Sequence, residues 1–132
     1  MFTQAEVISS FSVDNIDKAK QFYGETLGLA VEVGPMGALD IRFSNGGRAV
    51  IYEKPDHEPA TFTVLNFVTD DVEKTVDELN SKGITTKIYG DTQLPDMPPN
   101  DEKGIMRGED NAPEIAWFND PAGNVLAVVP AP

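Results

Sequence analysis

The stretch that decides the fold runs from Val13 to Leu29 and reads Val-Asp-Asn-Ile-Asp-Lys-Ala-Lys-Gln-Phe-Tyr-Gly-Glu-Thr-Leu-Gly-Leu. It predicts the end of a strand followed by a helix. Asp14 can cap the helix by accepting hydrogen bonds from free backbone N–H groups, and Asp17 adds a negative charge to the first turn. Gly28 favours the left-handed conformation that ends helices. The apolar residues recur at helical spacing: Ile16, Ala19, Phe22, Tyr23 and Leu27.

The first part of this stretch occurs a second time. Residues 69–76 read Thr-Asp-Asp-Val-Glu-Lys-Thr-Val and align without a gap with residues 13–20, which lie 56 positions earlier. Acid aligns with acid, Ile with Val, and Lys with Lys. An internal repeat of this kind indicates two copies of one structural unit.

Each copy lies among short segments with the alternation of β-strands. In the first half, strands are predicted at residues 6–13, 30–33, 38–43 and 48–53, with a hairpin turn at 45–47. In the second half, a helix is predicted at 71–82 with Gly83 as its stop, and strands at 61–68, 84–89, 115–118 and 125–129. The predicted fold class is therefore α+β, with two βαβββ modules in one domain of residues 1–132: module 1 at about 1–54, a linker at 55–60, and module 2 at about 61–132.

A long segment at residues 90–113 carries four prolines and several acids and is predicted to be a loop. Long loops in compact domains often have a function, such as a lid or a partner contact. An acidic insertion without a function is an equally good interpretation.

Composition narrows the classes of partner. The 22 acidic and 10 basic residues give a net charge of −12, which disfavours binding to nucleic acid or to anionic membranes. The charge serves solubility or attracts a cationic ligand. The absence of cysteine excludes thiolate metal sites. We find neither an apolar run long enough to cross a membrane nor a signal-peptide pattern, so we expect a cytoplasmic location.

Alternation gives each predicted strand two faces. The faces predicted to meet the helices are apolar: Phe11, Phe43, Val50, Tyr52, Leu65, Phe67, Phe118, Leu126 and Val128. The opposite faces are mixed: Ile8, Ser10, Ser12, Asp40, Arg42, Ala49, Ile51, Glu53, Val64, Asn66, Val68, Trp117, Val125 and Ala127. A mixed face of this composition suits the wall of a ligand site or a subunit interface.

Two motifs in this order resemble the vicinal oxygen chelate superfamily, the group of glyoxalase I, bleomycin-resistance proteins and extradiol dioxygenases. The first is the helix that ends in Phe22-Tyr23 and continues to Leu27-Gly28-Leu29. The second is the turn from Asp120 to Asn124, which resembles the Asp-Pro-x-Gly-Asn signature of the family. The resemblance covers essentially the whole chain. It implies sheets curled around a central cavity, helices on the outer face, and two chains in a dimer.

The resemblance also indicates where metal-dependent members place their ligands. The corresponding positions in this chain are Ile8, Ile51, Val64 and Ala127, and none of these side chains has a lone pair to offer. The usual metal chemistry of the family is therefore predicted to be absent, and we expect no cofactor. The only histidine, His57, lies in the Pro-rich linker. It is interpreted as a solvated loop residue rather than as a ligand or base.

The first functional hypothesis is a metal-independent protein that binds a cationic or aromatic compound, such as an antibiotic, as the bleomycin-resistance branch does. Trp117 would offer a stacking surface. Aligning Phe43 with Phe118 makes Arg42 its counterpart, able to bind a carboxylate or a ring. Polar and apolar positions would complete the site: Asp40, Glu53, Asn66, Ile8, Ile51, Val64 and Ala127. Packing of Trp117 and cross-strand ion pairs of Arg42, Asp40 and Glu53 are the structural alternatives.

Two other hypotheses stay open. One is a lyase or isomerase that uses Glu53 or Asp40, beside Arg42, as a carboxylate base. The other is a dimeric interaction module whose acidic loop contacts another protein. We assign no catalytic residue. The expected partners are a small-molecule ligand and a second copy of the chain, with no nucleic acid and no membrane.

Overall fold

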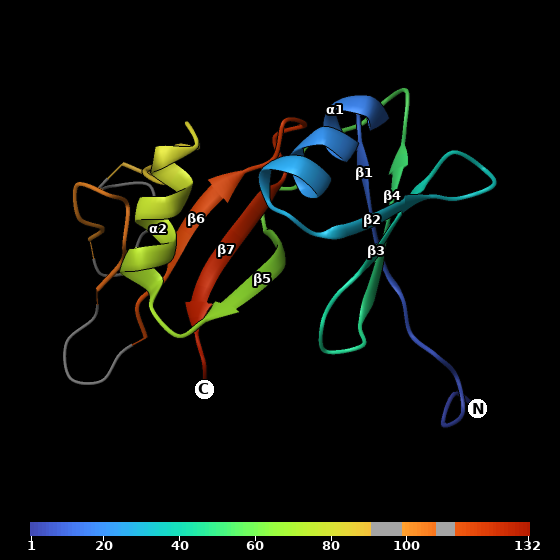
Figure 1. Cartoon of the computed structure of the whole chain (residues 1–132), viewed down its shortest axis with the longest axis horizontal. Helices are drawn as coiled ribbons and strands as arrows, with labels where there is room; N and C mark the ends of the chain where they lie inside the picture. The colour runs from blue at the N-terminus through green and yellow to red at the C-terminus, as the bar shows by residue number, and fades with distance from the viewer. Residues whose placement is uncertain (91–98, 108–112) are drawn as a thin grey trace. The chain divides into compact units, whose positions relative to one another are not determined.

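The computed structural model describes residues 1–90, 99–107 and 113–132. The chain forms two compact units, Met1–Pro59 and Ala60–Pro132, each with its own sheet and helix (Figure 1). The predicted α+β class is therefore confirmed. In the part of the chain that is described, no helix has both the length and the apolar character needed to span a membrane.

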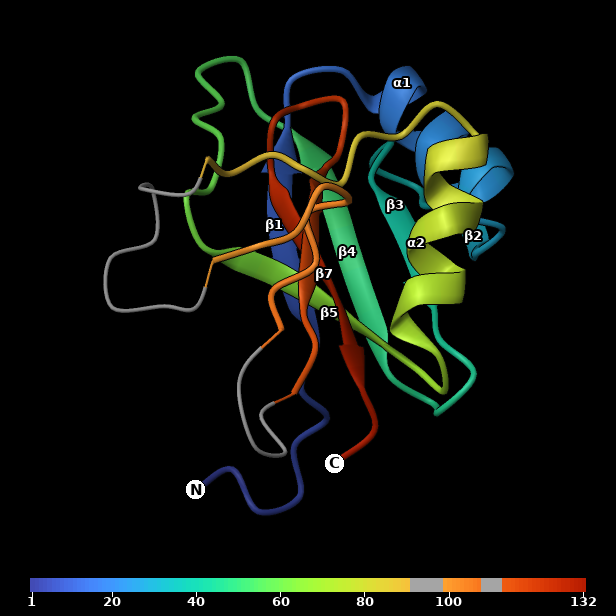
Figure 2. The ribbon, with the colours of Figure 1, turned by 90° about the vertical axis from the view of Figure 1, so that its left-hand side faces the viewer.

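The first unit contains a four-stranded sheet. Its elements are β1 (Ser9–Val13), α1 (Ile16–Lys20), the π-helical turn η1 (Gln21–Thr26), β2 (Ala30–Val33), β3 (Leu39–Arg42) and β4 (Arg48–Glu53). The strand order is β1-β4-β3-β2, with β1 parallel to β4 and the other neighbours antiparallel (Figure 2). β1 is shorter than the predicted 6–13, because Val7 and Ile8 precede it and are exposed.

The second unit contains a three-stranded sheet, and the predicted strand at 84–89 is wrong. Its elements are β5 (Thr63–Thr69), α2 (Val72–Ser81), β6 (Ala116–Asn119) and β7 (Val125–Pro130), in the order β5-β7-β6. Polar groups of Thr86 and Lys87 bond to the segment 99–107 instead of to a strand. The Thr86 hydroxyl donates to the Lys103 carbonyl at 2.6 Å, and the Lys87 ammonium donates to the Asp101 carbonyl at 2.8 Å.

Part of the predicted loop at 90–113 is held by backbone hydrogen bonds and isolated bridges. Residues 91–98 and 108–112 lie outside the described residues, and so do several of the loop's acids. Within 99–107, the chain makes a tight reversal: Asp101 N–H donates to the Ile105 carbonyl at 2.9 Å, and Gly104 N–H donates to the Asp101 carbonyl at 2.9 Å. Met106 then forms an antiparallel bridge with Ile115, just before β6.

Both helices begin one residue later than predicted. The side chain of Asn15, not Asp14, accepts from Lys18 N–H at 3.0 Å, and the side chain of Asp71 accepts from Lys74 N–H at 3.1 Å. The two caps occupy equivalent positions of the repeat, and their backbones are extended, as N-caps require. The predicted stops hold, because Gly28 has φ 75° and Gly83 has φ 83°.

The first helical segment is one residue longer between its cap and its stop glycine than the second. The turn η1 accommodates the extra residue by widening, and Leu27 N–H donates to the Phe22 carbonyl, five residues back, at 2.9 Å. The widened turn still buries Phe22 and Tyr23, and the Tyr23 ring lies 6.1 Å from that of Phe11 on β1. The helical segment therefore keeps its packing on the sheet.

The predicted faces are correct for β3 and for the second unit but wrong for β4. Register partners lie on the same face, and Ile51 pairs with both Phe11 and Leu39, all three of them buried. Ala49, Ile51 and Glu53 therefore lie on the helix-facing side. Val50 and Tyr52 lie on the opposite side with Asp40.

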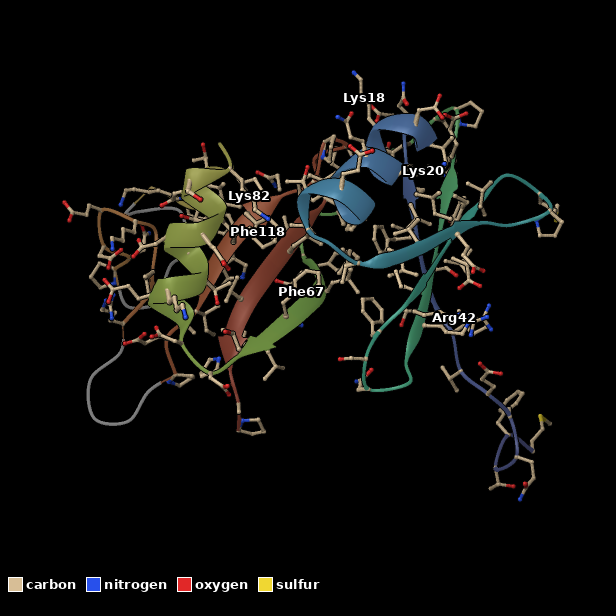
Figure 3. The ribbon with its side chains drawn as sticks, viewed as in Figure 1. Lys18, Lys20, Arg42, Phe67, Lys82 and Phe118 are labelled. Carbon is tan, nitrogen blue, oxygen red and sulfur yellow. The ribbon has the colours of Figure 1, made fainter. Side chains whose placement is uncertain are left out.

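The core of the second unit follows the predicted pattern. α2 packs against β7 and buries Val72, Val76 and Leu79. The Phe67 ring on β5 and the Phe118 ring on β6 stack with centroids 6.3 Å apart (Figure 3). The opposite face of this sheet carries the mixed residues.

Candidate ligand-binding faces

Three predicted site residues lie side by side across the second sheet. Asn66 on β5 pairs in register with Ala127 on β7, and Ala127 pairs with Trp117 on β6. They form one row on the face opposite Phe118 and Leu126. Asn66 is exposed, Trp117 is half-buried and Ala127 is buried. The row combines an amide, a small apolar residue and a large aromatic surface.

Tyr89 adds a second aromatic ring to this row. Its ring meets that of Trp117 edge to face, with centroids 5.5 Å apart and an interplanar angle of 77°. Burial raises the pKa of the Tyr89 hydroxyl, which therefore stays neutral at physiological pH. Sequence reasoning missed this residue because it placed Tyr89 at the end of a strand.

The backbone of Tyr89 is fixed by the neighbouring segment. The Asn100 amide donates to the Tyr89 carbonyl at 3.2 Å, and its oxygen accepts from the Lys87 ammonium at 2.7 Å. The segment 99–107 is itself tied to α2, because the Lys103 ammonium lies 2.8 Å from Asp77 and 3.2 Å from Glu73.

The corresponding row of the first sheet has different residues from those predicted. The two hairpin turns have the same bonds: Phe43 N–H donates to the Gly47 carbonyl, as Asp120 N–H does to Asn124. Counting from these turns, Trp117 corresponds to Asp40 and Ala127 to Val50. The predicted correspondences of Trp117 with Arg42 and of Ala127 with Ile51 are therefore wrong.

Asp40 is held by two arginines on this face. Arg48 on β4 binds its carboxylate with two nitrogens, at 3.2 and 2.8 Å, and the Arg42 guanidinium lies 3.8 Å away. The hydrogen bond and the charge of Arg48 lower the pKa of Asp40. Arg48 also reaches Glu6 at 3.5 Å. The arrangement is a cross-strand ion-pair cluster, in which Arg48 was not predicted.

Glu53 lies away from the predicted wall. It shares the helix-facing side of the sheet with Val13, and its carboxylate accepts from Ile16 N–H at the start of α1 at 3.0 Å. This carboxylate supports the helix start, so the structure gives it no place beside Asp40 and Arg42 as a base.

His57 is not a solvated loop residue, and the sequence interpretation is corrected here. Its side chain is half-buried, and its Nδ1 lies 2.7 Å from the Ser12 hydroxyl oxygen on β1. Lys54 N–H donates to the Val13 carbonyl at 3.0 Å, and His57 N–H to the Lys54 carbonyl at 3.0 Å. These bonds fasten the segment after β4 to the end of β1.

The positions that the resemblance predicts for metal ligands do not fit a metal ion, and neither does Val50, the counterpart of Ala127 in the first sheet. Ile8 precedes β1, Val64 lies at the register shift of β5, Ile51 is in the core, and Ala127 is in the row described above. None of these side chains has a donor atom. Elsewhere among the described residues, no group of three or more His, Cys, Asp or Glu is placed to hold a metal.

The chain matches a protein-family model over most of its length. The model of the Glyoxalase/Bleomycin resistance protein/Dioxygenase superfamily matches residues 7–128. No curated protein matches the chain.

Three solved structures share the fold over nearly their whole lengths. A glyoxalase family protein from Enterococcus faecalis is 19% identical with a TM-score of 0.65, and covers 98% of this chain and 99% of its own. TnmS3, an antibiotic binding protein from Streptomyces sp. CB03234, is 22% identical with a TM-score of 0.64, and covers 98% and 99%. A lactoylglutathione lyase from Agrobacterium tumefaciens is 17% identical with a TM-score of 0.67, and covers 97% and 94%. At these identities the likeness establishes the fold alone.

Proposed function

The chain belongs to the Glyoxalase/Bleomycin resistance protein/Dioxygenase superfamily, and from this premise we propose that it is a metal-independent small-molecule-binding protein that sequesters a cationic or aromatic compound, such as an antibiotic. The proposal follows the branch of the superfamily whose members bind rather than transform their ligands. The likeness to an antibiotic binding protein supports it at the level of the fold.

The observation that carries the proposal is the row of Asn66, Ala127 and Trp117, with Tyr89 against Trp117. Aromatic faces bind flat rings by stacking and bind cations through the ring quadrupole. The Asn66 amide can donate and accept hydrogen bonds, which gives such a site orientation. The net charge of −12 favours approach of a cation.

The alternative, a lyase or isomerase with a carboxylate base, has less support. Asp40 is paired with Arg48, which lowers its pKa and weakens it as a base at neutral pH. Glu53 is bonded to the start of α1. Each of the two candidate carboxylates is therefore engaged elsewhere.

The test is a titration followed by NMR of the ¹⁵N-labelled protein. The chain has one tryptophan, so the indole N–H signal reports on Trp117 alone. We expect berberine, a flat aromatic cation, to shift this signal saturably. Tetraethylammonium, a cation without a ring, is expected to bind far more weakly. If no aromatic probe perturbs Trp117, the proposal is wrong.

Calorimetric titration with Ni²⁺, Zn²⁺, Mn²⁺ and Fe²⁺ tests metal independence. We expect berberine to bind with the same affinity before and after treatment with a chelator. Stoichiometric metal binding would contradict the proposal and would favour an enzyme.

The proposal further takes the chain to act as a homodimer in the cytoplasm, with no nucleic-acid or membrane partner. The acidic excess supports the absence of nucleic-acid and membrane partners, because phosphate backbones and anionic lipids are repelled. Size-exclusion chromatography with light scattering tests the dimer, and a monomer at micromolar concentration would contradict it.

A further inference from the structure

Resting on the proposed function, we infer that Tyr89 determines ligand specificity: with Trp117 it forms an aromatic corner that accepts a flat ring, and Gly104 positions it there. The corner is assembled from two different kinds of structure. Trp117 is fixed in β6, whereas Tyr89 belongs to a segment outside the sheet.

The angle between the two rings is what makes a corner. At an interplanar angle of 77°, a third ring that stacks on the face of one aromatic presents its own edge to the face of the other. Offset stacking and edge-to-face contact are the two preferred geometries of aromatic pairs. A flat aromatic ligand satisfies both at once, and a positive charge on it is further stabilised by the π faces. A flexible aliphatic cation gains only the stabilisation of its charge by the π faces.

Both residues retain accessible surface, because Tyr89 and Trp117 are each only half-buried. Tyr89 also keeps a neutral hydroxyl, which can donate a hydrogen bond to a ligand oxygen or nitrogen. The corner therefore selects for a flat ring system, and the hydroxyl adds a polar contact at its rim.

Gly104 explains why Tyr89 stays in position. A Cβ atom at residue 104 would overlap the Thr86 carbonyl oxygen and the Lys87 Cα atom. The segment that carries Tyr89 thus packs directly on a backbone without a side chain. The hydrogen bond from the Thr86 hydroxyl to the Lys103 carbonyl joins the same two segments. A side chain at residue 104 would push the Tyr89 segment away from the segment 99–107.

The experiment measures the dissociation constant of berberine by calorimetry for the wild type and six variants, one of which is Trp117→Ala. We expect Tyr89→Ala to weaken binding about tenfold, and Tyr89→Phe to stay within about threefold of the wild type. Phe62→Ala, which removes an exposed aromatic in the same unit, is the matched control and should leave the constant unchanged.

The positioning role has its own pair of variants. Gly104 and Gly37 both have positive φ, at 84° and 82°, but a Cβ atom at Gly37 has no heavy atom within 4 Å. Gly104→Ala and Gly37→Ala therefore carry the same backbone strain, and only the first displaces Tyr89. We expect only Gly104→Ala to weaken berberine binding and to shift the Trp117 indole signal of the free protein.

The outcomes separate this inference from the proposed function. If Tyr89→Ala binds berberine as tightly as the wild type, or more tightly, while Trp117→Ala loses binding, the inference is wrong and the proposed function stands. If the wild type binds no aromatic probe, the proposed function fails and the inference fails with it. If Gly104→Ala and Gly37→Ala behave alike, Gly104 has no positioning role.

Discussion

Asp40 on β3 and Trp117 on β6 occupy equivalent positions in the two sheets. Each lies two residues before the last paired residue of its strand, and each pairs with the third residue of the strand that follows, Val50 or Ala127. One copy of the repeat thus carries an ion-paired carboxylate where the other carries an aromatic surface. The duplicated scaffold thus offers two chemically distinct faces.

The first prediction concerns pH and Asp40. Its pKa in the folded protein is lowered by Arg48, so the carboxylate contributes stability above its unfolded pKa of about 4 and loses that contribution as pH falls through the folded value. We expect Asp40→Asn to lower the Tm at pH 7 and to match the wild type more closely as the pH falls below about 4. Thermal unfolding followed by circular dichroism between pH 2.5 and 7 measures this. A difference in Tm that does not change with pH would contradict the role of the ion pair.

The second prediction concerns the helix caps. Asn15→Ala and Asp71→Ala each remove a side-chain acceptor from a helix start, and each should lower the free energy of unfolding by about 1 kcal/mol. Asp14→Ala and Asp70→Ala, one residue earlier, are matched controls and should change it by less than about 0.5 kcal/mol. Urea denaturation measures all four. A larger loss for the controls would mean that the helices begin one residue earlier.

The third prediction concerns Ser12 and His57. Their hydrogen bond joins β1 to the segment after β4, so Ser12→Ala and His57→Ala should each destabilise the protein by about 1 kcal/mol. The double variant should cost less than the sum of the two, because both single variants break the same bond. Urea denaturation of the four proteins completes the cycle. Strict additivity would contradict a direct interaction.

The fourth prediction concerns the row on the second sheet. Trp117→Phe keeps an aromatic face and should weaken binding of berberine by only a few-fold, whereas Trp117→Ala should weaken it at least tenfold. Ser10→Ala changes the position in the first sheet that corresponds to Asn66 and should have no effect. Calorimetry measures the three constants. If all three variants bound berberine with equal affinity, Trp117 would not be part of the site.

The sequence predicted most of the fold because its strongest signals are local. The stop glycines Gly28 and Gly83 and the hairpin glycine Gly46 all have the positive φ that their contexts require. The helix caps were placed one residue early for a simple reason. Asp14-Asn15 and Asp70-Asp71 each offer two consecutive residues able to cap, and only the backbone conformation distinguishes them.

The errors arose where the local sequence pattern does not determine which side of the sheet a residue faces or which segment it contacts. β4 reads Arg-Ala-Val-Ile-Tyr-Glu, with four apolar residues in succession, so alternation cannot say which of them faces the helix. The register of β4 with β1 and β3 determines which residues face the helix, and this register depends on residues that are far apart in the sequence. Ile51 and Glu53 were assigned to the ligand wall for this reason. Tyr89 was missed because its segment has strand-like alternation, yet its partners lie beyond residue 98.

The widened turn η1 has a consequence for the alignment of the two copies of the repeat. A residue inserted in a regular helix rotates every later side chain by about 100° about the axis. Here the extra residue leaves Tyr23 packed on Phe11 and Gly28 at the end of the helix. The turn thus accommodates a one-residue difference in length between the two copies of the repeat, while the packing of the helical segment on its sheet is kept. Comparison of the two halves by a constant offset consequently fails by the end of the helical segment, where Gly28 corresponds to Gly83, although their first strands and helix caps still correspond.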